Sequence, residues 1–177
     1  MTEETLVVIK PDGVARGLTG RIIEQFLDAG LVLTRLELRS ASADLIERHY
    51  PDDEAWLSSV GGKTIADYER LGLDPAEFFG GVDPVAIGRV IKNWLVDYLT
   101  QGPVVAMVLR GNEAIGRVRT LCGNTVPAMA DPSTIRGRFS SDSAAAANAE
   151  KRPIQNLVHA SGNAQEANYE IGLWFPS

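Results

Sequence analysis

Short apolar runs alternate along the chain with stretches of helical periodicity. Thr5 to Lys10 form one apolar run that ends in a Pro-Asp-Gly turn, and residues 102–111 form another, GPVVAMVLRG. Short apolar runs bounded by Pro and Gly predict strands. Residues 31–39 alternate well enough for a strand with one solvated face, and residues 154–161 are the last strand candidate. These segments supply the strands of one predicted sheet.

Helical repeats fill most of the gaps between these strands. In residues 19–29 the apolar side chains fall on one helical face, and Gly30 supplies a C-terminal stop. Asp83 and Pro84 resemble an N-cap and a first helical position. Further helices are predicted after Ser42, over about residues 112–121, and from Asn163 to near Trp174.

The order strand, helix, strand, helices, strand, helix, strand predicts an α+β sandwich, and we expect its helices on one face of the sheet. Residues 1–177 are expected to form a single domain with inserted segments at about 51–83 and 140–153. The first segment is rich in Gly and Asp and suggests short helical pieces. The second contains a run of small residues, which predicts a mobile or weakly helical segment.

Composition limits the kinds of partner. A chain of 177 residues with 45% apolar and 23% charged residues is typical of a soluble globular protein. No apolar run is long enough for a membrane span, and the acidic N-terminus does not resemble a signal peptide. Cys122 is the single cysteine, which fits a reducing cytoplasm. The net charge of −6 argues against nucleic acid as the main partner.

Few residues suggest chemistry on their own. The sequence GGKT at residues 61–64 ends like a phosphate-binding loop, but Leu57 stands where that motif needs glycine. His49 lies on a predicted helix and is interpreted as a partly buried polar residue. His159 ends an apolar strand, and the small residues after it leave room for a large group. Taken alone, a histidine in this setting is structural more often than catalytic.

Several segments together resemble the nucleoside diphosphate kinase family. Residues 5–26 resemble the N-terminal signature of that family, and QGPVVAMVL at residues 101–109 resembles its SGPVVAMVL. TIRGRF at residues 134–139 resembles TIRGDF, and NLVHASGN followed by EIGLWF resembles the active-site segment. These matches cover about two-thirds of the chain in the order found in the family. The resemblance implies a ferredoxin-like βαββαβ sandwich with an antiparallel sheet and additional helices.

The resemblance also implies a reaction and a set of residues. A terminal phosphoryl group would pass from a nucleoside triphosphate to a nucleoside diphosphate by a ping-pong mechanism through a phosphohistidine. His159 would be the nucleophile, and Glu170 would accept a hydrogen bond from its other ring nitrogen. Lys10, supported by Tyr50, would donate to the transferred phosphate. The remaining nucleotide contacts would be Arg119, Thr125 and Arg136 to phosphates and Asn156 to the ribose.

Base contact is less well defined by the resemblance. Counting back from GPVV places Ile91 and Leu95 where the side chains that contact the base would lie. Trp94 or an aromatic residue of the inserted segment, Phe78 or Phe79, could also serve. Two other departures from the family pattern affect local hydrogen bonding: Gly162 and Arg138 each replace an aspartate.

Partners and alternatives follow from the same resemblance. Mg²⁺ is expected to arrive on the nucleotide phosphates, so no metal site of the protein is predicted. A homo-oligomer (hexamer, tetramer or dimer) is expected. Two alternatives remain open: a non-catalytic nucleotide-binding homologue, and a protein-histidine phosphotransfer module. The second is disfavoured because a protein acceptor would not require the basic and polar set of Lys10, Arg119, Thr125 and Arg136.

Overall fold

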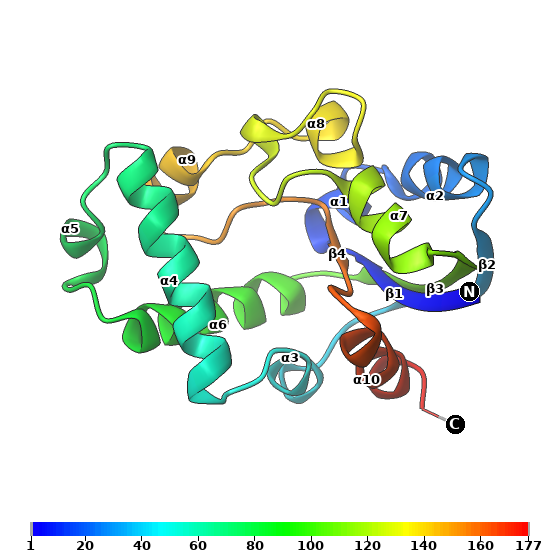
Figure 1. Cartoon of the computed structure of the whole chain (residues 1–177), viewed down its shortest axis with the longest axis horizontal. Helices are drawn as coiled ribbons and strands as arrows, with labels where there is room; N and C mark the ends of the chain where they lie inside the picture. The colour runs from blue at the N-terminus through cyan, green and yellow to red at the C-terminus, as the bar shows by residue number, and fades with distance from the viewer. Residues whose placement is uncertain (1, 177) are drawn as a thin grey trace.

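A computed structural model of the protein describes residues 2–176 and contains one four-stranded antiparallel sheet, which lies toward the right of the molecule in Figure 1. The strands lie in the order β2-β3-β1-β4. Their bounds are β1 Thr2–Ile9, β2 Val32–Arg39, β3 Val104–Asn112 and β4 Val158–Ala160. With the helices between them, these strands form the ferredoxin-like βαββαβ arrangement, so the predicted α+β fold is confirmed.

Helices occupy the connections that the periodicity indicated, and the N-caps expected at Asp83 and Asn163 are confirmed. Ser42, Asp83 and Asn163 each accept a hydrogen bond from a backbone N–H in the first turn of the helix that follows. Within residues 2–176, no helix is long and apolar enough to cross a bilayer. The helical bounds are α1 Pro11–Ala15, α2 Thr19–Asp28, α3 Ala43–His49, α4 Glu54–Arg70, α5 Pro75–Phe79, α6 Pro84–Thr100, α7 Ala114–Cys122, η1 (3₁₀) Pro127–Met129, α8 Ile135–Phe139, α9 Ala144–Ala149 and α10 Ala164–Trp174.

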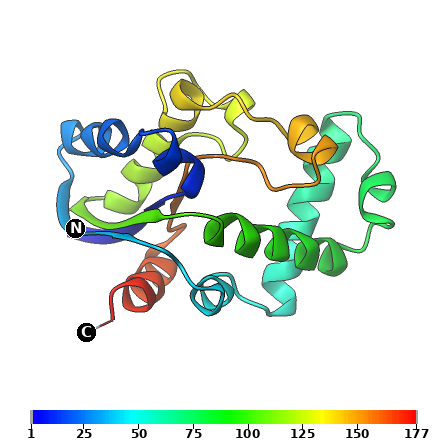
Figure 2. The same cartoon turned by 180° about the vertical axis from the view of Figure 1, so that it is seen from behind.

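Helices cover both faces of the sheet (Figures 1 and 2). Val7 and Ile9 of β1 pack into a core with α2 and α7, whereas Leu6 and Val8 pack into a second core with α3, α6 and α10. The prediction of helices on one face was therefore wrong. The nearly continuous apolar runs of β1 and β3 explain the difference, because strands that are buried on both faces lack polar alternation.

The first inserted segment is more regular than its sequence suggested. It contains α4, a helix of 17 residues that crosses α6 to the side of the sheet (Figure 1). A Cβ atom at Gly61 would overlap the backbone carbonyl of Pro84, and one at Gly88 would overlap that of Leu57. Glycine therefore allows the two helices to touch along their backbones. The GGKT sequence lies inside α4, which excludes the strand–loop–helix context of a phosphate-binding loop.

Candidate functional site

The candidate site forms where β1 ends beside β4. Val8 pairs with His159 across the antiparallel β1–β4 ladder, and Lys10 directly follows β1. The last helix, α10, returns along β1 and brings Glu170 beside His159. The sheet and α10 thus bring together residues that lie far apart in the sequence.

A carboxylate holds one nitrogen of the His159 ring. Glu170 Oε1 lies 3.0 Å from His159 Nε2, and its Oε2 accepts a 2.6 Å hydrogen bond from the Ser161 hydroxyl. Burial opposes the charge on Glu170, but His159, His49 and Ser161 outweigh burial and lower its pKa. An ionised Glu170 must accept, so Nε2 of His159 donates and Nδ1 carries the free lone pair. The His159 side chain is 17% exposed, so a ligand can reach it.

A second histidine packs against the first. The His49 ring lies edge-to-face on the His159 ring, with centroids 4.4 Å apart. His49 Nδ1 accepts a 3.1 Å hydrogen bond from the Trp174 indole. Burial, followed by the nearby His159 ring, lowers the His49 pKa to about 3, so His49 is neutral at ordinary pH. His49 was interpreted as partly buried, but it is only 4% exposed and also forms a wall of the site.

Tyr50 follows His49 and lies beside the same ring. Its aromatic ring is 6.2 Å from that of His159, edge-to-face, and 4.6 Å from that of His49. Burial and the Glu170 charge raise the pKa of Tyr50, so its phenol stays protonated and can donate.

Lys10 is a buried cation beside this cluster. It is 4% exposed, and its Nζ donates a 2.7 Å hydrogen bond to Asn156 Oδ1. Asn156 Nδ2 in turn donates to the backbone carbonyl of Thr125 at 2.9 Å. Burial, and then the charge of Arg136, lower the pKa of Lys10 to about 7, although Asp12 partly offsets them. A cation buried at this energetic cost needs an anionic partner, which a phosphate would supply.

Arg136 is nearly buried and is bound mainly to backbone. Its guanidinium donates to the carbonyls of Gly123, Asn156 and Val158 at 2.8, 3.1 and 2.8 Å. These bonds fix the guanidinium rigidly, and they use three of its five N–H groups. Two N–H groups remain for an added ligand.

The other predicted nucleotide contacts lie on different elements. Arg119 is exposed on α7, and its charge, after burial, helps to lower the pKa of Arg136. The Thr125 side chain is exposed. Ile91 and Leu95 are half-buried on α6, and Leu95 packs against the core that contains Tyr50.

His49, His159 and Glu170 also offer three potential metal ligands within 4.8 Å of one another. Their lone pairs are largely occupied, because Glu170 accepts from His159 and Ser161 and His49 Nδ1 accepts from Trp174. Two imidazoles and one carboxylate also do not suit Mg²⁺, which prefers oxygen ligands. This cluster therefore serves hydrogen bonding rather than Mg²⁺ binding.

Sequence reasoning missed three contributors to the site. Ser161 was interpreted only as a small neighbour of His159, yet its hydroxyl orients Glu170. His49 was not expected to touch His159. Asp12 accepts a 3.3 Å hydrogen bond from the Leu157 amide, and its charge acts on Lys10. The HASG segment contained the signal for Ser161, since a hydroxyl two residues after a histidine in a strand faces the same side.

The site can perform one kind of chemistry well. The partly exposed His159 ring has a free lone pair on Nδ1 and lies beside the Tyr50 ring. The buried Lys10 ammonium and the fixed Arg136 guanidinium both bind Asn156, three residues before His159. An imidazole nitrogen with a free lone pair can attack an electrophilic phosphorus atom, and the cationic donors can stabilise the charge on its oxygens.

The sequence of this chain is similar to those of known proteins. A family model described as nucleoside diphosphate kinase matches residues 3–56 and 87–177. A nucleoside diphosphate kinase of Pyrobaculum aerophilum is 51% identical over 173 residues, which cover 98% of this chain and 94% of that protein. One of Mycobacterium tuberculosis is 38% identical over 177 residues, which cover 99% and 98%.

Solved structures are similar over almost the whole chain. A crystal structure of an NDP kinase from Pyrobaculum aerophilum has a TM-score of 0.95 and 49% sequence identity, and the match covers 100% of this chain and 97% of that one. A nucleoside-diphosphate kinase from Borrelia burgdorferi, a transition-state mimic with bound vanadate and ADP, has a TM-score of 0.77 and 31% identity. That match covers 99% of this chain and 88% of the other.

Proposed function

The chain belongs to the nucleoside diphosphate kinase family, and from this premise we propose how its own residues carry out the reaction. The protein transfers the terminal phosphoryl group of a nucleoside triphosphate to a nucleoside diphosphate. The proposed nucleophile is Nδ1 of His159. One observation carries this assignment: Glu170 holds Nε2 at 3.0 Å, which leaves the lone pair on Nδ1 of an accessible ring.

The reaction has two half-reactions. In the first, Nδ1 of His159 forms a bond to the terminal phosphorus while the bond from that phosphorus to the bridging oxygen breaks. The nucleoside diphosphate leaves with the electron pair. As the ring becomes positively charged, Glu170 stabilises the proton on Nε2 and remains ionised. In the second, a terminal oxygen of another diphosphate attacks the same phosphorus while the bond from Nδ1 to that phosphorus breaks. The electron pair returns to Nδ1, and His159 returns to its neutral form.

Cationic donors supply the rest of the catalysis. In such a transfer, negative charge spreads over the peripheral oxygens of the phosphoryl group, and fixed donors near it lower the barrier. We assign this role to Lys10, Arg136 and Arg119, together with the Tyr50 phenol. A bound triphosphate raises the pKa of Lys10 by its negative charge and so keeps the ammonium protonated during the transfer. We assign the Thr125 side chain to a phosphate and Asn156 to the ribose.

Mg²⁺ is proposed to arrive on the nucleotide. It would neutralise part of the phosphate charge and keep several water ligands, and no residue of the chain needs to coordinate it. The Borrelia burgdorferi relative binds vanadate and ADP. That pair supports our placing a diphosphate beside a phosphoryl mimic in a site of this fold.

Other features of the function are also proposals. We assign Ile91 and Leu95 on α6 to the base. The protein is proposed to act in the cytoplasm, as one domain with inserted segments at about 51–83 and 140–153. Homo-oligomerisation is supported by β2, an edge strand on which Leu36 and Leu38 are 51% and 66% exposed. An edge with exposed apolar side chains favours pairing with a second copy.

Transfer between nucleotides tests the proposal directly. The protein is incubated with ATP labelled on the terminal phosphate, freed of nucleotide, and mixed with a pure nucleoside diphosphate as the sole acceptor. We expect an acid-labile, alkali-stable phosphoenzyme that passes its label to the diphosphate, and no label on a folded His159→Ala variant. Labelling of that variant would refute His159 as the nucleophile.

A further inference from the structure

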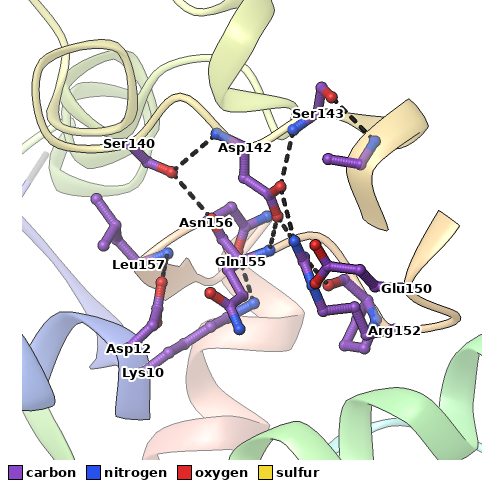
Figure 3. Close-up of polar contacts among 12 residues, drawn as sticks. Lys10, Asp12, Ser140, Asp142, Ser143, Glu150, Arg152, Gln155, Asn156 and Leu157 are labelled. Carbon is purple, nitrogen blue, oxygen red and sulfur yellow. Dashed lines mark hydrogen bonds and ion pairs between the residues drawn. The ribbon is translucent and has the colours of Figure 1, made fainter. Parts of the chain in front are cut away.

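The second inserted segment contacts the chain just before β4. Gln155, which precedes the ladder, has both of its backbone groups bound to side chains of that segment (Figure 3). Its N–H donates to Asp142 Oδ2 at 2.7 Å, and its carbonyl accepts from the Ser140 hydroxyl at 3.0 Å. Backbone groups outside a ladder need such partners. The inserted segment therefore supplies the partners of both backbone groups of Gln155.

Asp142 is the centre of this contact. Its carboxylate accepts from Arg152 Nη1 at 2.6 Å, from Arg152 Nη2 at 3.1 Å and from the Ser143 amide at 3.0 Å (Figure 3). The Asp142 and Arg152 side chains are 12% and 23% exposed. Such a two-pronged ion pair is more rigid than a surface pair. Arg152 Nε also binds Glu150 at 2.6 Å, so the guanidinium is held on two sides.

The segment held in this way is strained. Leu157 has a φ of +69° and is fully buried, a conformation that side chains other than glycine rarely adopt. Strained backbone persists only where its surroundings fix it. The Leu157 N–H donates to Asp12, and its carbonyl accepts from the Lys10 amide at 2.8 Å.

Two functional residues flank the strained position. Asn156, immediately before Leu157, accepts the hydrogen bond from Lys10 Nζ at 2.7 Å. His159 lies two residues after Leu157. A relaxation of the backbone at Leu157 would therefore displace the partner of the cation and the nucleophile together.

We propose that the Asp142–Arg152 ion pair is a positioning element of the catalytic site: by fixing Gln155 it sets the place of Asn156, and through Asn156 the place of the Lys10 ammonium. The inference rests on the proposed function of Lys10. Neither Asp142 nor Arg152 touches a reacting atom in this scheme. The second inserted segment thus acts as a brace for the phosphate-binding lysine.

Loss of the brace has a consequence beyond lower activity. Burial is the largest cause of the low pKa of Lys10. If residues 155–157 relax, water reaches the ammonium and its pKa rises toward the ordinary value. In the free enzyme, kcat/KM reports this pKa as the alkaline limb of its pH profile. Breaking the ion pair therefore lowers kcat/KM and moves the alkaline limb upward.

The test compares Asp142→Ala, Arg152→Ala and the double variant with the full-length protein. The matched control is Arg110→Ala, because Arg110 is an exposed arginine far from the site. It lies opposite Glu4 in the β1–β3 ladder, at the end of β3 away from Ile9 and the site. Each single variant is expected to lose about tenfold to a hundredfold in kcat/KM for phosphoenzyme formation, as a misplaced catalytic group does. The double variant should have a kcat/KM no lower than that of the less active single variant, because both changes break the same interaction.

Two readouts separate positioning from general instability. Circular dichroism should show folded variants, and the alkaline limb of their pH profiles should lie at least about one unit above that of the wild type. The control should match the wild type in both. An unmoved alkaline limb, or additive losses in the double variant, would overturn the proposal. Labelling of His159→Ala would instead count against the proposed function, so the two failures are distinguishable.

Discussion

Replacing Lys10 by methionine should abolish activity and yet stabilise the protein below pH 7. The Lys10 pKa falls from 10.5 to about 7 on folding, chiefly through burial. One pKa unit corresponds to about 1.36 kcal/mol, so burying the charged ammonium costs the free protein about 5 kcal/mol. Methionine has a similar length and no charge, but it leaves Asn156 Oδ1 without its donor, which costs about 1–3 kcal/mol. The net gain is expected to be about 2–4 kcal/mol.

The pH dependence distinguishes this origin from ordinary packing. Below pH 7 Lys10 is charged in both the folded and the unfolded protein, and the folded state carries the full cost. Between pH 7 and 10.5 only the unfolded protein retains the proton, so wild-type stability gains about 1.4 kcal/mol per pH unit relative to Lys10→Met. Above pH 10.5 the charge contributes nothing.

Urea unfolding of the free proteins at pH 6, 7, 8 and 9 measures the difference directly. We expect the variant to be more stable at pH 6 and its advantage to disappear by about pH 9. A variant that is less stable than the wild type at pH 6, or a difference that is constant with pH, would refute the view that Lys10 is buried as a destabilising cation.

Two further experiments test separate parts of the structure. Glu170→Gln removes the charge that holds His159 and also one of two hydrogen-bond acceptors, because the amide nitrogen would face a donor from His159 or Ser161. Rapid-quench kinetics should show that phosphoenzyme formation slows about tenfold to a hundredfold. An unchanged rate would contradict the role of Glu170. Gly88→Ala should lower the free energy of unfolding by about 1–3 kcal/mol, because the new Cβ would overlap the Leu57 carbonyl. The control is Gly62→Ala on the same helix pair. Its Cβ meets no atom within 4 Å, so this change should raise the free energy of unfolding by about 0.5–1 kcal/mol. Equal effects in chemical denaturation would contradict the close crossing of α4 and α6.

Helices whose ends are marked by capping residues were predictable from the sequence, because a cap acts over only a few residues. Asp83 and Asn163 cap helices because their side chains bind amides two or three residues away. Only short helical pieces were expected where the 17-residue helix α4 lies, because Gly61 weakens a helix locally. The benefit of Gly61 comes instead from contact with Pro84 and the rest of α6. Long-range packing of this kind leaves no periodic signal. The second inserted segment was expected to be mobile or weakly helical, and its helix α9 spans only Ala144–Ala149.

The predicted site was incomplete for a related reason. The resemblance named His159 and Glu170, and the structure brings them into contact. It did not indicate Ser161, whose hydroxyl orients the carboxylate, or Asp142, whose ion pair lies in the second inserted segment. Such supporting contacts depend on how distant segments meet. Pattern matching at single positions does not reveal them.

The position of the phosphate on the phosphoenzyme tests the central claim most directly. Because Glu170 holds Nε2 of His159, we expect the transferred group to attach to Nδ1. Phosphorus and proton NMR of the isolated phosphoenzyme, with His159→Ala as the reference, should show one phosphohistidine bearing phosphate on Nδ1. Phosphate on Nε2, or on any residue other than His159, would contradict the account.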